Sequence, residues 1–316
     1  MQVIGFLKNQ RLALGKPVRK DNGGGFEWPT ILLLAACYGT WAWATTWASA
    51  VFLPLGIAVT ALSITLHSSL QHEVLHGHPF RSRALNHALV FLPLGLLFPY
   101  GRFRDLHLAH HRDENLTDPY DDPESNYFDP KVWRRLPGWL QGLLRFNNTL
   151  FGRLTVGPAI GTWFFLKGEI AAIRAGDAQV RRDWLLHLAG MVPVVAWVWQ
   201  AAIPGWAYLL AAYAGLSVLK IRTFLEHRAH ALPRGRTVII ERPGPLAFLF
   251  LNNSLHVVHH AKPQVPWYRL PRLYREGRAE FQRRNEGYVY ASYAEIFRRY
   301  LFRAKDPVPH PLMPQD

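Results

Sequence analysis

The chain has 316 residues, a formal net charge of +14 and a single cysteine, Cys37, which lies in an apolar run. One cysteine excludes a disulfide framework and a metal site built on thiolates. Although the charge is strongly basic, no recognised nucleic-acid-binding motif accompanies it, so no nucleic-acid partner is expected. The basic excess is explained first by membrane topology and by anionic lipid headgroups.

Two long segments, residues 28–72 and 184–219, contain no Asp, Glu, Lys or Arg. A helix needs about 20 apolar residues to cross a bilayer, so each segment can hold two helices joined by a tight turn. The turns are expected near Ala48 to Leu53 and near Ala202 to Gly205. The alternative is a soluble helical core, but a buried hairpin seldom runs this long without a charge. We predict an all-α membrane protein, one domain over residues 1–316, with four transmembrane helices in two hairpins at approximately 30–47, 51–70, 184–202 and 205–222.

Basic residues predict the orientation of these helices. They occur in the amino-terminal segment, as at Lys8 and Arg11, throughout the middle segment, and after the fourth helix at Arg222 and Arg228, whereas the two turns have none. The positive-inside rule then places both termini and the middle segment in the cytoplasm. Several of seven tryptophans lie near the expected helix ends, as an interfacial belt requires, and others could fill the core of the bundle. The seven are Trp41, Trp43, Trp47, Trp184, Trp197, Trp199 and Trp206.

The segments outside the hairpins are shorter or more polar. The first 20 residues lack the pattern of a cleaved signal peptide. The apolar stretches Ala88 to Pro99 and Leu154 to Leu166 are too short to span, so we expect them along the membrane surface or under a cytosolic cap. The aromatic and basic segment from Trp267 to Arg303 is expected to lie on the surface over the site or to contact a partner. The last dozen residues are rich in proline and are expected to be poorly ordered.

Eight of the 15 histidines fall in three clusters with one spacing rule. Residues three and four apart share a helix face, so each cluster would direct two or three imidazoles at one point. Surface histidines or a helix end could explain any one cluster, but three together predict a site for two metal ions on the cytoplasmic side. The clusters are His72-Glu-Val-Leu-His76, His107-Leu-Ala-His110-His111 and His256-Val-Val-His259-His260.

The chemistry of the ligands narrows the choice of metal. Imidazole nitrogen suits iron, zinc, copper or nickel and disfavours magnesium or calcium, which prefer oxygen ligands. Glu73 and Glu226 adjoin histidines, where each could accept an imidazole N–H or pair with an arginine. Asp121 and Asp122 are interpreted as ordinary turn residues. A metal transporter is the alternative from another class, but transport sites usually lie near the bilayer midplane, whereas these clusters follow helix ends on one side.

The order of the clusters around two hairpins resembles the membrane fatty acid desaturase superfamily, whose pattern is HxxxH or HxxxxH, then HxxHH, then (H/Q)xxHH. The resemblance covers about positions 30 to 270 and includes Asn115-Leu-Thr-Asp-Pro and Asn252-Asn253-Ser-Leu. It implies a ninth histidine ligand between the fourth helix and the third cluster. His227 is our choice, and His230 is the alternative. His67 and His78 are expected to lie beside the ligands rather than among them.

The resemblance implies two iron ions (Fe2+/Fe3+), bound by the eight clustered histidines and His227, and O2 as co-substrate. Such a centre removes hydrogen from an unactivated carbon of a lipid or fatty acyl chain. Loss of a second hydrogen gives a double bond, and transfer of oxygen gives an alcohol. We expect a desaturase because of the spacing of the clusters. A hydroxylase acting on an acyl chain or other hydrocarbon is the alternative, since His256 in place of Gln and the short first gap occur in both. No electron-transfer module is fused, so electrons must come from a separate ferredoxin-, rubredoxin- or cytochrome b5-like protein and its reductase.

Overall fold

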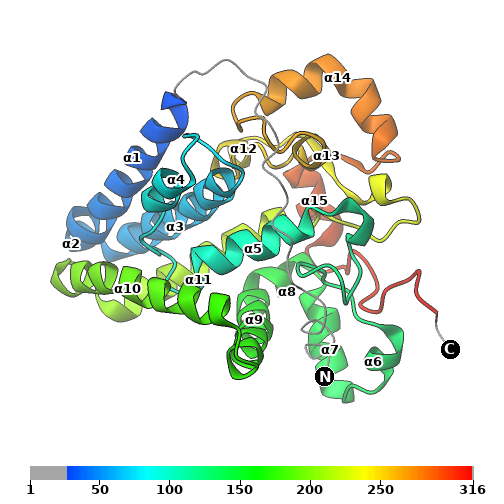
Figure 1. Cartoon of the computed structure of the whole chain (residues 1–316), viewed down its shortest axis with the longest axis horizontal. Helices are drawn as coiled ribbons and strands as arrows, with labels where there is room; N and C mark the ends of the chain where they lie inside the picture. Colours follow the sequence, from blue (N-terminus) through cyan, green and yellow to red (C-terminus); the bar gives the residue numbers. More distant parts are fainter. Residues whose placement is uncertain (1–26, 315–316) are drawn as a thin grey trace.

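The computed structural model describes residues 27–314, which are mostly helical (Figure 1). The basic amino-terminal segment used to predict orientation, and the expected absence of a signal peptide there, lie outside the described residues. The helices in chain order are α1 Trp28–Trp43, α2 Ser49–Val51, α3 Leu53–Leu75, α4 Arg83–Leu89, α5 Tyr100–His110, α6 Pro130–Arg134, α7 Gly138–Asn147, α8 Leu150–Thr155, α9 Gly157–Arg174, α10 Ala178–Gln200, α11 Gly205–Thr223, α12 Leu246–Leu249, α13 His256–Ala261, α14 Leu270–Arg284 and α15 Tyr293–Tyr300.

Three short helical segments and two strands complete the described chain. The π segment η1 Ala44–Ala48 joins α1 to α2, and the 3-10 segments are η2 Asp113–Asn115 and η3 Pro233–Arg236. Strands β1 Ile239–Arg242 and β2 Val289–Ser292 pair in parallel, with Ile239 opposite Val289. This small sheet lies between the third histidine cluster and the carboxy-terminal helices.

The first predicted hairpin is present as two helices. Helix α1 continues through η1 into α2, and the chain is then interrupted at Phe52, whose backbone is extended (φ −152°, ψ 95°). Pro54 stands in the first turn of α3, where its fixed φ suits a helix start and its missing N–H costs no hydrogen bond. The turn therefore falls within the predicted interval. Helix α3 runs past the predicted end at residue 70 to Leu75, so that His72 lies on its last turn.

The second hairpin, α10 and α11, begins earlier than predicted. The Asp177 carboxylate accepts hydrogen bonds from the backbone N–H groups of Gln179 and Val180, and so caps α10 well before Trp184. The charged residues 181–183 were expected outside the helix, but they occupy its first two turns. The connection at 201–204 matches the predicted turn.

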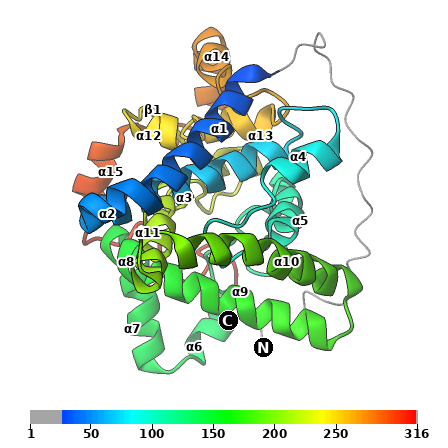
Figure 2. The ribbon, with the colours of Figure 1, turned by 90° about the vertical axis from the view of Figure 1, so that its left-hand side faces the viewer.

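Close packing between α3 and α11 holds the two hairpins together. The Thr65 hydroxyl donates to the Gly215 carbonyl at 2.9 Å. A Cβ atom at Gly215 would lie 2.9 Å from the Ala61 carbonyl oxygen, so the two helices can approach this closely only with glycine there. Helix α1 packs along the other side of α3 (Figure 2).

The apolar stretch Ala88 to Pro99 does not lie along a surface. Leu94 is fully buried against Trp41 and Tyr208, and the Tyr208 hydroxyl donates to the Leu94 carbonyl at 2.7 Å while accepting a hydrogen bond from Trp41 Nε1 at 3.0 Å. The stretch therefore runs between the hairpins, because its backbone finds hydrogen-bond partners there. The second stretch, Leu154 to Leu166, belongs to α8 and α9, and α9 packs beside α10 and α11.

Within the described residues, one helix, α3, is long and apolar enough by length and composition to cross a bilayer, and 50% of its most apolar window is buried. The other three predicted crossings coincide with helices whose outer faces expose large apolar side chains. Trp47, Val192, Trp199, Trp206 and Leu209 are each more than half exposed. A bilayer crossing by these three helices stays a prediction.

Candidate metal centre

Four segments far apart in the sequence bring nine imidazoles together in the interior. These segments are the end of α3, the end of α5, the chain just beyond α11, and α13 (Figure 1). The nine residues are His72, His76, His107, His110, His111, His227, His256, His259 and His260. All of the sequence-predicted positions therefore meet, including the choice of His227 as the ninth.

The third cluster faces inward because of how its short helix is packed. Val257 and Val258 of α13 are buried against Leu270 and Tyr274 of α14. Because residues three and four apart share a helix face, burying the valines on one side turns His256, His259 and His260 toward the other.

The imidazoles form two groups. In the first group, the possible ligand atoms of five histidines lie within 4.8 Å of one another, and in the second group those of four do. The first group is His72, His76, His107, His111 and His259; the second is His110, His227, His256 and His260. The groups are adjacent, because the rings of His111 and His260 stack with centroids 4.2 Å apart.

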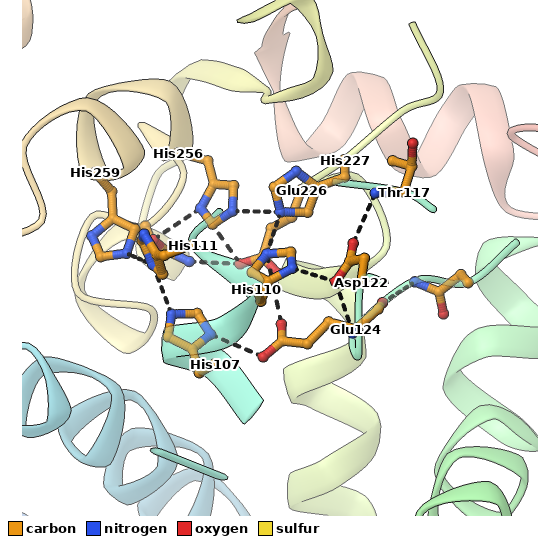
Figure 3. Close-up of polar contacts among 12 residues, drawn as sticks. His107, His110, His111, Thr117, Asp122, Glu124, Glu226, His227, His256 and His259 are labelled. Atoms are coloured by element: carbon orange, nitrogen blue, oxygen red, sulfur yellow. Dashed lines mark hydrogen bonds and ion pairs between the residues drawn. The ribbon is translucent and has the colours of Figure 1, made fainter. Parts of the chain in front are cut away.

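Close nitrogen contacts show that each group converges on one point (Figure 3). In the first group, His111 Nε2 lies 2.9 Å from His107 Nε2 and 3.1 Å from His259 Nε2. In the second, His227 Nε2 lies 2.8 Å from His110 Nε2 and 3.0 Å from His256 Nε2. Each group thus points several nitrogen lone pairs at the same small volume, as a metal ion requires.

Two orphaned nitrogens test whether a metal fits. The Nε2 atoms of His72 and His76 are buried and have no hydrogen-bond partner among the described residues. A buried polar atom without a partner is costly, and native proteins rarely contain one. A metal ion in the first group would satisfy both atoms. The donor set consists of nitrogen alone, which agrees with the metals expected from the sequence.

Three of the rings are oriented by a hydrogen bond at Nδ1, while Nε2 faces the other imidazoles. His107 Nδ1 lies 2.9 Å from a Glu124 carboxylate oxygen, and His110 Nδ1 lies 2.8 Å from an Asp122 oxygen (Figure 3). His256 Nδ1 lies 3.1 Å from the Asn253 side-chain oxygen. When Nδ1 donates to these acceptors, Nε2 keeps a lone pair directed into the group.

Some of these hydrogen-bond partners of the histidines were not predicted from the sequence. Asp122, interpreted as a turn residue, also orients His110 and accepts the Thr117 backbone N–H, so the turn interpretation was incomplete. Glu124 was not considered because it lies 13 positions beyond His111, where spacing carries no signal. Asn253 belongs to the quoted Asn252-Asn253-Ser-Leu motif but was given no role.

The two carboxylates expected beside the ligands act less directly. Glu226 accepts a hydrogen bond from Asn253 at 2.6 Å and pairs with Arg222 at 2.9 Å, and Asn253 in turn contacts His256. Glu73 instead accepts the Trp267 backbone N–H at 3.0 Å and contacts no metal-facing nitrogen. The carboxylates therefore brace neighbouring segments. Glu226 connects onward through Asn253 to His256 of the second group, whereas Glu73 lies 3.9 Å from His78, which belongs to neither group.

The remaining candidates lie outside the two groups. His230 contacts the Leu232 backbone rather than the other imidazoles. His67 contacts the Tyr38 hydroxyl at 3.1 Å, and His78 pairs with Glu27 at 2.8 Å. Neither His67 nor His78 belongs to the two groups.

Burial keeps the inward-facing rings neutral. Burial, followed by the neighbouring His111, lowers the pKa of His107 well below its ordinary value, and burial and His76 do the same for the pKa of His259. The pKa of His227 is also lowered by burial and by His110. His110 is the exception: burial lowers its pKa, but Glu124 and Asp122 outweigh burial and raise it to about 9.

These shifts predict that the metal-free protein loses stability in acid. A histidine with a lowered pKa in the folded state binds protons more readily when unfolded, so its stabilising effect is lost as the pH falls below about 6.5. For each of His107, His227 and His259, the free energy of unfolding can fall by up to about 1.4 kcal/mol per pH unit. His110 does not oppose this, because a raised pKa contributes fully below about 6.5 and is lost only toward about 9. Thermal unfolding midpoints should therefore fall between about pH 6.5 and 5; a midpoint that rises there would contradict the prediction.

The described carboxy-terminal residues, up to position 314, are ordered, contrary to expectation. Val308 and His310 are buried, and the backbone N–H of Phe128 donates to Val308 while that of His310 donates to Phe128. Proline-rich composition suggested disorder, but these hydrogen bonds and the burial hold the segment against the site.

Comparison with known proteins agrees with this geometry. A family model described as fatty acid desaturase matches residues 43–292. A beta-carotene ketolase from Paracoccus sp. (strain N81106 / MBIC 01143) is 28% identical over 235 residues, covering 71% of this chain and 78% of the ketolase. Another, from Paracoccus sp. (strain PC1), is 25% identical over 226 residues, covering 68% of this chain and 74% of that ketolase. The chloroplastic omega-6 fatty acid desaturase of Spinacia oleracea is 23% identical over 264 residues, covering 77% of this chain but only 57% of the spinach enzyme.

Proposed function

Because the chain belongs to the fatty acid desaturase family, we propose that it uses O2 to oxidise an unactivated C–H bond of a lipid at two iron ions held by its nine clustered histidines. Family membership makes the chain a desaturase-like oxidoreductase and sets the transporter alternative aside. The observation that carries the proposal is the convergence of nine buried or partly buried imidazoles into two adjacent groups. Five nitrogens are available to one ion and four to the other.

The protein residues have defined tasks in this chemistry. When bound, iron supplies oxygen activation and the electron transfer that breaking a C–H bond needs. Burial holds the rings of His107, His227 and His259 neutral, so their lone pairs are available. Asp122 and Glu124 set the orientation of two rings. The enclosing helices exclude water, which confines the reaction to a substrate held beside the metals.

We propose a fatty acyl chain as substrate and a double bond as product. A substrate dissolved in lipid would reach the site between the helices, whose outer faces are apolar. Oxygen insertion is the second candidate, because two ketolases match this chain over about three quarters of their own length. The shared site geometry does not by itself distinguish the two outcomes.

Lipid mass spectrometry tests the reaction. Cells that express the wild type should be compared with cells that express a His110→Ala, His259→Ala variant, which removes one ligand from each group. An acyl chain that loses two hydrogen atoms only with the wild type supports desaturation, and a chain that gains one oxygen supports hydroxylation. If a carotenoid rather than an acyl chain changes, the acyl assignment is wrong. If purified wild type contains no iron, the metal assignment fails.

We propose further that four helices cross the membrane and that the termini and site face the cytoplasm. Four helices overlap the two uncharged segments, although α10 begins at Ala178, ahead of the second one, and the positive-inside rule predicts their direction. In a Cys37→Ser background, a cysteine at Phe52 should react with a membrane-impermeant thiol reagent from outside the cell. A cysteine at Arg272 should react only after the membrane is opened, and the reverse pattern would refute the topology.

An acidic electron-transfer protein is the proposed partner, because the proposed reaction needs a source of electrons. Helix α14 packs directly on α13, which carries three of the nine histidines, and it exposes five arginines. Arg272, Arg278 and Arg283 each pair with a glutamate, and Arg275 and Arg284 complete the set. Electrostatic complementarity would steer an acidic donor to this helix.

Charge reversal on α14 should therefore slow electron delivery. Arg275→Glu should lower the reduction rate several-fold with a protein donor and weaken its salt dependence, because a rim charge acts mainly on association. Reduction by a small chemical reductant should not change. Arg135→Glu, on the exposed end of α6, is the matched control. Equal effects of both substitutions would argue against docking on α14.

A further inference from the structure

The ninth histidine is held differently from the other eight. The other eight lie on α3, α5 or α13, or at the cap position just beyond a helix end, as His76 and His111 do. His227 instead follows the end of α11 in a segment that belongs to no helix or named strand. Local hydrogen bonds from the N–H of Arg228 to the Arg236 carbonyl and from the N–H of Val238 to the Glu226 carbonyl support this segment. Further contacts to the His227 segment come from a distant part of the chain.

Those contacts come from a segment near the carboxy terminus, Lys305–His310, here called the strap. The Lys305 ammonium donates to the main-chain carbonyl of His227 and pairs with Asp306 at 2.9 Å. The Lys305 side chain is only 9% exposed. A buried ammonium is costly unless it is well paired, so this contact is a strong restraint on the His227 backbone.

The strap also ties down the segment two residues beyond His227. Asp306 accepts a hydrogen bond from the Tyr127 hydroxyl at 2.6 Å, and that hydroxyl accepts the Ala229 backbone N–H at 3.0 Å. The strap backbone is anchored in turn, because the N–H of Lys305 donates to the Asn148 carbonyl at 3.1 Å. A small polar cavity of about 50 Å³ lies beside these contacts and is lined by Glu124, His227, Lys305 and Asp306, among others.

The same strap fixes the loop that orients His110. Phe128, just beyond the loop residues Asp122 and Glu124, exchanges backbone hydrogen bonds with Val308 and His310. His310 Nε2 also lies 3.3 Å from the Thr117 hydroxyl, at the start of the loop. The strap therefore holds both irregular segments that serve the second histidine group, and the same loop carries Glu124, which orients His107 of the first group.

We propose that the strap completes the second metal site, with Lys305 as a positioning residue that holds His227 in place. The strap lies beyond residues 43–292 that match the family, so family membership does not imply this role. The Lys305 side chain contacts the backbone of His227, a residue of the second group. Loss of this one contact, with the rest of the strap intact, should thus weaken one metal ion of the pair selectively. This inference rests on the proposed metal centre.

The test uses the full-length protein and two independent measurements. Lys305→Met keeps the approximate length of the side chain but removes the charge, and Lys305→Arg keeps the charge. Arg303→Met is a matched control at an exposed arginine two residues before the strap. The number of iron ions per protein chain is measured as the concentration of a chelator is increased. Hydrogen exchange is measured at the Ala229 amide, which requires no metal.

In Lys305→Met, one iron should become about 10–100-fold easier to remove while the other is retained, and the Ala229 amide should exchange faster. Lys305→Arg should restore most of both properties, and Arg303→Met should match wild type. Unchanged exchange in Lys305→Met would overturn the proposal, as would equal loss of both ions. If wild type holds no iron but Lys305→Met still exchanges faster at Ala229, the proposed function fails while the positioning by Lys305 stands.

Discussion

Replacing His107 or His260 with alanine should abolish product formation while the protein still inserts into the membrane. Each residue supplies one nitrogen to a different histidine group, and each ring is buried among the others. Loss of a residue that only hydrogen-bonds to a metal ligand typically lowers metal affinity or activity about 10–100-fold. Loss of a ligand itself should therefore lower activity more than about 100-fold. Product formation in cells and iron per purified chain are the measurements.

His87→Ala is the control for these substitutions. Its ring packs on Tyr100, with centroids 4.9 Å apart, and it belongs to neither histidine group. It should therefore retain activity and iron. Wild-type activity in both His107→Ala and His260→Ala would refute the site, whereas equal losses in all three variants would indicate a general folding defect.

The second large effect is expected at Glu226. This carboxylate and its partner Arg222 have side chains only 8% and 6% exposed, and Glu226 also accepts the Asn253 amide that leads to His256. Glu226→Leu would leave the Arg222 charge buried and unpaired, which costs about 3–5 kcal/mol. The thermal unfolding midpoint should fall markedly, and iron retention should fall with it.

A second variant separates stability from metal binding. Arg222→Met combined with Glu226→Leu removes both charges, so much of the lost stability should return. Iron retention should stay low, because Asn253 still lacks the partner that orients it toward His256. Glu286→Leu is the matched control: its pair with Arg234 is exposed, and its loss should cost less than about 1 kcal/mol. If Glu226→Leu is as mild as Glu286→Leu, the buried pair does not support the site.

Much of the site could be predicted from the sequence because helical spacing is a local property. Histidines three and four apart must share a helix face wherever the helix lies, so His107 and His111 were expected to point together before any tertiary structure was known. The uncharged runs similarly predicted both helical hairpins and their turns. The choice between His227 and His230 could not be settled this way, because neither lies on a helix.

What the sequence alone determined was the ligand chemistry, the three helical clusters and the two hairpins, all of which follow from spacing and composition within short windows. Only the tertiary structure decided how the nine imidazoles divide into two groups, that Asp122 and Glu124 orient two of them, and that the proline-rich end is ordered. These features depend on contacts between residues up to about 190 positions apart, such as Thr117 with His310. No local pattern encodes such contacts, because they exist only once the helices have packed and each buried polar group has found its partner.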